Sequence, residues 1–246
     1  LVVTTPSIVR ARMVENYVQG IIAGIGGAGD GSGIRIQSRM WFNDSNNSRY
    51  YLLPGVVVMV MTMIGALLTS LVMAREYERG NFEAIFITPM RTGEALFAKA
   101  LINFMLGMVG LTIILISARY VFEVPLRGNI LILASGSALY LLVALGIGLV
   151  ISSVTKNQFV ACQLTLILTF MPAMILSGFL YEINNMPTVL QWVTLLVPGR
   201  YYVEFLQTVF LAGDIWPIVL KDMAVLGSFA LIFLTIATKK NPKSLE

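Results

Sequence analysis

The chain has 246 residues, of which 57% are hydrophobic and 12% are charged, and its formal net charge is +4. Soluble domains carry about 25% charged residues, so this composition, with a mean hydropathy of +0.81, excludes an ordinary soluble domain and indicates a single membrane domain. The lone cysteine, Cys162, and the absence of histidine exclude disulfide frameworks, thiolate clusters and His-based catalysis. We therefore expect no catalytic residue, no bound cofactor and no metal site in this chain.

Residues 1–52 are the polar part and are expected to form part of an extracytoplasmic domain. Thr5 and Pro6 begin a predicted helix that continues to about Ala23. The glycine-rich loop "GIGGAGDGSG" and a short predicted strand, "IRIQSRMWF", follow. No segment within these residues could export them, so we expect an N-terminally truncated chain that an earlier transmembrane helix once preceded, with a cleaved signal as the alternative.

Residues 53–246 are expected to form an all-α polytopic membrane domain. Five apolar segments are long enough to cross a bilayer as helices, which takes about 20 residues. They are residues 53–74, 100–121, 129–152, 158–180 and 216–238. The distribution of Lys and Arg places residues 75–99 and the C-terminus in the cytoplasm. Because five is an odd number, the N-terminal segment is then outside.

Residues 181–215, which we call the hairpin, do not form a simple span. They contain two apolar pieces, separated by Pro198, Gly199 and Arg200, and each piece is too short to cross a bilayer. Two short helices that dip into the outer leaflet or lie on it would satisfy their backbone groups best.

Polar chemistry inside the predicted spans is sparse. Acidic residues are absent from the span interiors, and Lys221 and Asp222 lie near a span end, which disfavours proton coupling. Asn103 and Gln163 are the candidates for a polar translocation path. The chain also lacks the phosphate-binding pattern G-x-x-x-x-G-K-[ST]. Uphill transport would therefore draw its energy from another subunit.

Residues 75–99, which we call the coupling segment, concentrate charge between the first two spans. If the first span continues as a helix to about Thr88, then Phe82, Ile85 and Phe86 share one face. Pro89 ends this predicted helix, and Thr92 begins a new one. An apolar ridge flanked by charges suits docking into a groove on a soluble partner. The alternative is an ordinary juxtamembrane loop whose charges set topology.

The coupling segment also resembles the cytoplasmic loop of ABC-2 type exporter permeases, with the pattern E-x-x-R-G-T-x-E-x-L-x-x-T-P followed by E and G-K. The matching residues are Glu76, Arg79, Gly80, Glu83, Thr88, Pro89, Glu94 and Lys99. The chain departs from the pattern at Asn81 and Ala98. The approach to the first span, with Pro54 and Gly55, and the hairpin resemble the same family, so the resemblance covers the chain from about Arg39 onward.

The resemblance implies a transport subunit of an ABC exporter, which is not itself an enzyme. It implies a homo- or heterodimer with a second permease subunit, and two separate ATPase subunits that bind ATP and Mg. It implies six transmembrane helices, of which five are present here. It places the protein in a bacterial inner membrane among lipids, with a periplasmic adaptor as a further partner to test for and no role for nucleic acid. The residues expected to couple to the ATPase are Glu76, Arg79, Gly80, Phe82, Glu83, Phe86, Thr88 and Pro89. Those expected to shape an extracytoplasmic gate in the hairpin are Gly178, Pro187, Pro198 and Gly213.

Two other classes of function remain open from the residues. One is a secondary transporter or channel that works without ATP. The other is a membrane scaffold whose coupling segment recruits a soluble partner without transport. The first predicts ion-dependent flux in liposomes without ATP, and the second predicts binding without ATP-dependent transport.

Overall fold

The computed structural model describes residues 17, 48–80, 92–121, 127–181 and 183–240. The chain divides into two compact units, Leu1–Asn46 and Asn47–Glu246, and only Tyr17 of the first unit is described. The strand predicted before residue 50, and the helix predicted there apart from Tyr17, therefore lie outside the described residues, as do residues 81–91 of the coupling segment. Apart from Tyr17, every described residue belongs to the second unit.

The described residues of the second unit form helices joined by short turns. The first two spans and the central one comprise α2 (Ser48–Thr62), the π-helical turn η1 (Met63–Leu68), α3 (Thr69–Glu78), α5 (Thr92–Tyr120) and α6 (Ile130–Thr155). The fourth comprises α7 (Gln158–Thr165), the π-helical turn η2 (Leu166–Phe170) and α8 (Met171–Ile175). The hairpin and last span comprise the 3-10 turn η3 (Ile183–Asn185), α9 (Thr188–Thr194), α10 (Pro198–Gln207), the π-helical turn η4 (Thr208–Ala212) and α11 (Trp216–Lys240).

Five of these helical segments are long and apolar enough to cross a membrane, which confirms the predicted all-α class and the number of spans. They are Leu52–Glu78, Phe97–Tyr120, Ile130–Thr155, Gln158–Ile175 and Trp216–Lys240. The fourth ends five residues before its predicted end at 180, because the backbone leaves the helix after Ile175 and Gly178 takes a positive φ of 88°. Two short helices, α9 and α10, occupy the hairpin as predicted.

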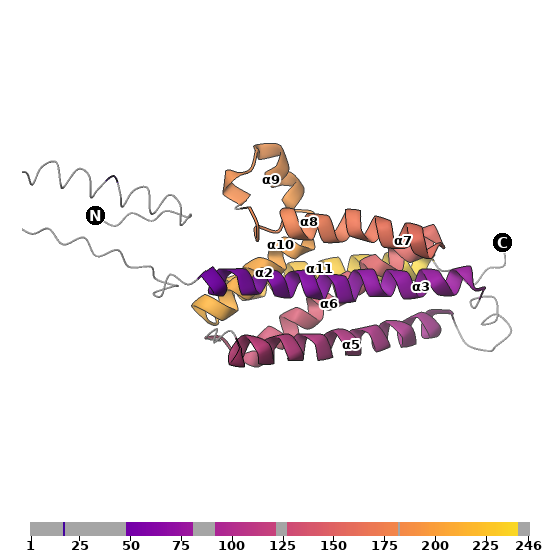
Figure 1. Cartoon of the computed structure of the whole chain (residues 1–246), viewed down its shortest axis with the longest axis horizontal. Helices are drawn as coiled ribbons and strands as arrows, with labels where there is room; N and C mark the ends of the chain where they lie inside the picture. The colour runs from indigo at the N-terminus through magenta and orange to yellow at the C-terminus, as the bar shows by residue number, and fades with distance from the viewer. Residues whose placement is uncertain (1–16, 18–47, 81–91, 122–126, 182, 241–246) are drawn as a thin grey trace, which may run out of the picture. The chain divides into compact units, whose positions relative to one another are not determined.

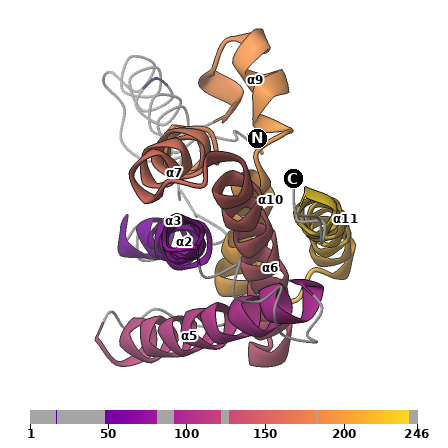
Figure 2. The ribbon, with the colours of Figure 1, turned by 90° about the vertical axis from the view of Figure 1, so that its right-hand side faces the viewer.

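Helix α6 lies at the centre of the bundle, between α3, α5, α7 and α11 (Figures 1 and 2). Its sequence is apolar all round, as expected for a buried helix, and most of its residues are buried. Glycines allow its close contacts. A Cβ at Gly148 would lie 2.6 Å from the backbone oxygen of Ala66, and one at Gly146 would lie 2.8 Å from the Cβ of Phe233. Small residues of this kind let helix backbones approach in a membrane.

Stacked tyrosines join the hairpin to α6. The rings of Tyr140 and Tyr202 stack with centroids 4.1 Å apart. The Tyr202 hydroxyl donates to the Oγ of Ser137 at 2.8 Å, and the Tyr140 hydroxyl shares a hydrogen bond of 2.5 Å with Thr62. Burial raises the pKa of Tyr202, so its hydroxyl stays a neutral donor. These bonds satisfy buried polar groups and orient α10 on α6.

Candidate functional site

The coupling segment begins where α3 ends, and this end corrects one prediction. A helix continuing to about Thr88 was expected, but α3 stops at Glu78. Gly80 adopts a φ of 68°, and its N–H donates to the carbonyl of Tyr77. A glycine in this left-handed conformation is a common helix stop, because other residues are strained there. Gly80 of the motif therefore turns the chain at the end of the first span.

Two motif residues that are 23 positions apart meet at this end of the bundle. Lys99 of α5 donates to the carboxylate of Glu76 on α3, and both side chains are mostly shielded. One helical turn further along α5, Asn103 donates through its Nδ2 to the Oγ1 of Thr69 at 3.1 Å. Residues four apart lie on one face of a helix, so this face of α5 is bonded to α3 at both positions.

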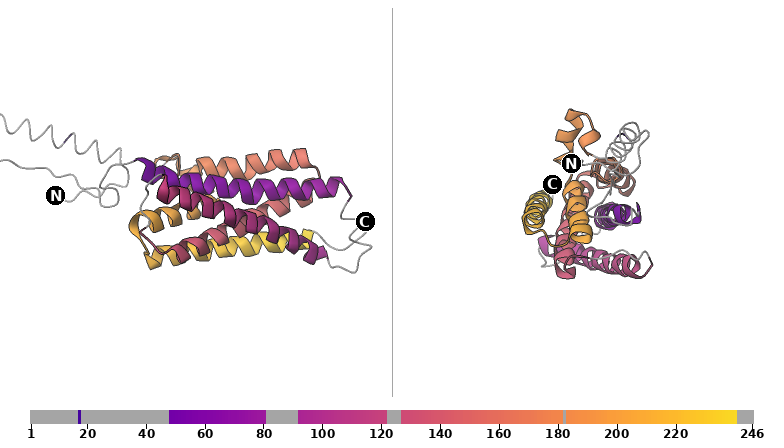
Figure 3. Two further views of the ribbon diagram at one scale, coloured as in Figure 1. Left: turned by 60° about the horizontal axis from the view of Figure 1, so that its bottom comes forward. Right: turned by 90° about the vertical axis from the view of Figure 1, so that its left-hand side faces the viewer.

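A second carboxylate of α3 bonds to the fourth span. The Oε1 of Glu78 accepts a hydrogen bond of 3.1 Å from the backbone N–H of Gln158, the first residue of α7. Figures 1 and 3 show α7 and α8 running beside α2 and α3. Sequence reasoning missed Glu78, because nothing in the local pattern shows which helix start its side chain will meet.

Of the remaining predicted coupling residues, the structure describes only Arg79. Arg79 is exposed and follows the last residue of α3. The others lie outside the described residues; they are Phe82, Glu83, Phe86, Thr88 and Pro89. Their role at a partner surface stays a prediction.

The two candidates for a polar path occupy different environments. Asn103 is 6% exposed and belongs to the α3–α5 interface described above. Gln163 is exposed on α7. The described contacts do not bring them together, so a path that both residues line stays a prediction.

The residues predicted to shape a gate lie at turns, with Gly178 just before the hairpin and the other three within it. Gly178 and Gly213 have φ values of 88° and 90°, which favour glycine. Pro187 precedes α9, and Pro198 is the first residue of α10, where its missing N–H costs no helical bond. After Gly213, the carboxylate of Asp214 accepts the N–H of Asn129 at 2.9 Å, which ties the hairpin's end to the start of α6. A gating role for these residues stays a prediction.

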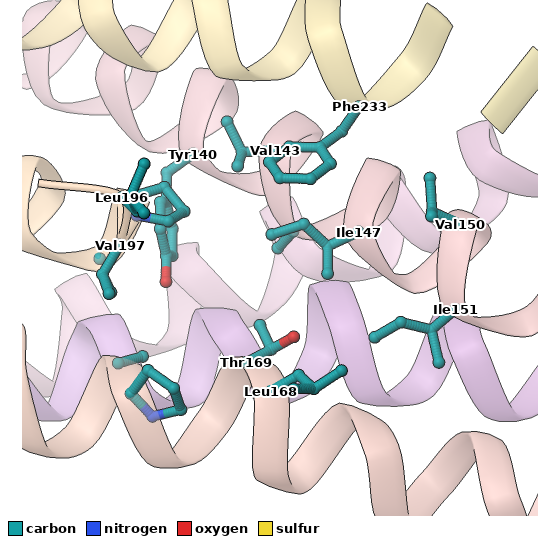
Figure 4. A pocket seen from close by; sticks show the side chains of 15 residues that line it. Tyr140, Val143, Ile147, Val150, Ile151, Leu168, Thr169, Leu196, Val197 and Phe233 are labelled. Carbon is teal, nitrogen blue, oxygen red and sulfur yellow. The ribbon is translucent and has the colours of Figure 1, made fainter. Parts of the chain in front are cut away.

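A cavity of about 270 Å³ lies between α6, η2, α8, α11 and the turn before α10 (Figure 4). Its lining is apolar except for Tyr140 and Thr169. The Thr169 hydroxyl is buried and has no hydrogen-bond partner in the described part of the chain. The volume is slightly below the roughly 300 Å³ at which small-molecule sites begin. The cavity suits a small apolar group that carries one hydrogen-bonding atom.

An unexpected buried charge lies in the last span. Asp222 is near the start of α11, as predicted, but it is 0% exposed. Its carboxylate oxygens have no hydrogen bond among the described residues, and the Nζ of Lys221 lies 3.6 Å from Oδ1. Lys221 also pairs with Glu204 of α10 at 3.1 Å. The position of Asp222 in the sequence placed it near a helix end, but nothing in the local sequence indicated that its side chain is buried.

Comparison with known proteins identifies the family. The family model described as ABC-2 family transporter protein matches residues 5–239. The chain belongs to the ABC-2 transporter family. The resemblance seen in the coupling segment and hairpin is thus confirmed over nearly the whole chain. No solved structure matches this ABC-2 chain.

Several curated relatives of this ABC-2 chain are permeases. It is 40% identical to the probable multidrug ABC transporter permease YbhS of Escherichia coli, over 96% of the chain and 64% of that protein. It is 26% identical to the probable multidrug ABC transporter permease YbhR of Escherichia coli, over 89% of the chain and 60% of that protein. It is 27% identical to the ABC transporter G family member 20 of Dictyostelium discoideum, over 81% of the chain and 28% of that protein.

The chain spans a little under two thirds of the length of the two bacterial permeases. Its family and its five apolar helices make it a multi-pass membrane segment of a member of the ABC-2 transporter family.

Proposed function

We propose that the protein containing this chain is the membrane-spanning permease of an ATP-driven exporter, and that a separate ATPase subunit drives it through the coupling segment. The proposal rests on the bonds made at the end of α3, in a chain that belongs to the ABC-2 family. Glu76 bonds to Lys99, Glu78 bonds to α7, and Gly80 turns the chain between them and residues 81–91. Direct bonds from the end of α3 to two neighbouring spans offer a route by which movement of the coupling segment could enter the bundle.

In this proposal the ATPase pair binds ATP and Mg, and this chain binds neither. ATP binding closes the pair, which moves the coupling segment through contacts with Phe82, Glu83 and Phe86. The permease works as a homo- or heterodimer. These steps follow the family pattern, and the absence of a phosphate-binding loop in this chain supports a separate source of energy.

We further propose a location in a bacterial inner membrane, with residues 1–52 outside and the C-terminus in the cytoplasm. The distribution of Lys and Arg supports this orientation. The cargo is hydrophobic or amphipathic. The apolar spans and the apolar cavity around Thr169 support this class, as do the names of the two bacterial relatives, which are called probable multidrug transporter permeases.

The proposal is tested with the full-length protein in cells that also express an ABC ATPase subunit encoded beside its gene. Wild type should retain the ATPase subunit on purification and lower the accumulation of an amphipathic dye. Replacing both Glu83 and Phe86 by alanine should abolish retention and efflux. Leu231→Ala is the matched control, because Leu231 is 69% exposed on α11, outside the coupling segment.

Three outcomes would contradict the proposal. Export in cells that lack any partner ATPase would indicate a secondary transporter. Retention of the ATPase without ATP-dependent export by wild type would indicate a scaffold. Full retention and efflux in the Glu83 and Phe86 double variant would remove the coupling role of this segment.

A further inference from the structure

The end of α3 contacts two spans through two different faces. Adjacent residues of an α-helix are rotated by about 100°, so positions 76 and 78 point about 200° apart. Glu76 accordingly reaches Lys99 on α5, while Glu78 reaches Gln158 on α7. Two carboxylates in one turn thus attach α3 to two neighbouring helices.

The contact between α3 and α7 extends over more than one turn. Ala74 packs with Ala161 in a small apolar cluster. Ser70 donates to the carbonyl of Ala161 at a longer distance of 3.5 Å. Ser70, Ala74 and Glu78 are spaced four residues apart and therefore form one stripe on α3. Glu78 is the last and most polar contact of that stripe.

Glu78 also accepts a hydrogen bond from one of the free N–H groups at the start of α7. The first N–H groups of a helix have no partner inside it. The side chain of Asn157 accepts from Phe159 and Val160, at 3.0 and 3.1 Å, and Glu78 accepts from Gln158. A negative charge at this end is further favoured by the helix dipole. Removing the carboxylate therefore leaves one N–H of α7 without its protein partner.

Helix α7 continues without interruption through η2 into α8. This continuous segment carries Leu168, Thr169 and Pro172, which line the cavity between α6 and α11. A displacement applied at the first turn of α7 would thus be passed to the wall of the cavity.

We infer that Glu78 is a positioning residue, which passes movement of the coupling segment into α7 while Glu76 passes it into α5. This inference rests on the proposed function, because it describes how coupling reaches the spans. Glu78 touches neither cargo nor nucleotide. It acts through the N–H of Gln158, so an amide oxygen at position 78 should preserve much of its effect.

The first test measures the bond itself in the full-length protein without nucleotide. Amide hydrogen exchange at the first turn of α7 should become about tenfold faster in Glu78→Ala, since a hydrogen bond to a charged group is lost. Glu78→Gln should restore most of the protection. Equal exchange in wild type and Glu78→Ala would overturn the inference, and this result does not depend on any transport activity.

The second test measures movement. Spin labels on Phe97→Cys of α5 and Phe159→Cys of α7, in a Cys162→Ser background, are each paired with a reference label on Leu131→Cys, an exposed position in the first turn of α6. In wild type, both distances should change when the ATPase binds a non-hydrolysable ATP analogue. In Glu78→Ala the change at α7 should be lost and that at α5 kept, with ATPase retention unchanged and efflux reduced about tenfold. Glu78→Gln should regain both.

Two results would overturn the inference while leaving the proposed function intact. One is a Glu78→Ala variant with wild-type movement of α7 and wild-type efflux. The other is loss of efflux caused by loss of the ATPase subunit, which would make Glu78 a docking residue. Absence of ATP-dependent efflux in wild type would instead refute the proposed function, and the exchange experiment would still decide the Glu78 contact.

Discussion

Gly148 provides a direct test of the packing between α6 and the first span. A Cβ at this position would lie 2.6 Å from the backbone oxygen of Ala66 and 3.2 Å from the backbone nitrogen of Ser70. Ordinary contact begins at 3.4 Å, so Gly148→Ala requires the helices to separate by several tenths of an ångström. Backbone atoms cannot rotate away as a side chain can. Overpacking of this kind costs about 1–3 kcal/mol.

The matched control is Gly227→Ala in α11, where an added Cβ meets nothing within 4 Å. Both substitutions gain up to about 1 kcal/mol of helix propensity, so the difference between them isolates the close contact. We expect Gly148→Ala to be about 1–3 kcal/mol less stable than Gly227→Ala, measured by unfolding in the same detergent. Equal stability of the two variants would refute the argument that α6 and the first span touch through their backbones.

Two further predictions concern buried polar groups. Asp222→Leu should raise the free energy of unfolding by about 1–3 kcal/mol, because it removes a buried carboxylate that has no hydrogen bond among the described residues, while Lys221, which lies 3.6 Å from it, keeps Glu204 as its ion-pair partner; a lower unfolding temperature in detergent would contradict this. Tyr202→Phe should cost about 1–2 kcal/mol, because Ser137 loses its buried partner. Tyr201→Phe, whose hydroxyl makes a longer 3.2 Å bond at the surface, should cost less than about 0.5 kcal/mol in the same assay, and equal losses would contradict the importance of the buried bond.

Some sequence predictions depended only on local chemistry, and these agree with the structure. The five spans follow from the length and hydropathy of each segment, which do not depend on the neighbours. The division of the hairpin into two short helices follows from Pro198, which begins α10 because its backbone suits the first helical turn. The family resemblance, carried by the spacing of motif residues, is confirmed by the family match.

The end of α3 shows where local reasoning is insufficient. The apolar spacing of Phe82, Ile85 and Phe86 favoured one long helix, but Gly80 turns the backbone with a positive φ. Helical periodicity says nothing about a single residue that leaves the helical region. Gly80 also belongs to the family motif. Its match to the motif predicted a role in coupling, and a glycine at this position is equally compatible with the end of a helix.

The sequence by itself determined that this chain is a membrane domain with five apolar spans, two short helices before the last span and the motif of the ABC-2 family, because hydropathy, proline and glycine act over a few residues. Only the tertiary structure decided which side chains meet. Lys99 reaches Glu76 and Gln158 reaches Glu78 because α3 packs between α5 and α7 in one particular register. Asp222 faces the interior for the same reason: the rotation of α11 against its neighbours sets its burial. Register and rotation arise from contacts between distant segments, and a single sequence does not display them.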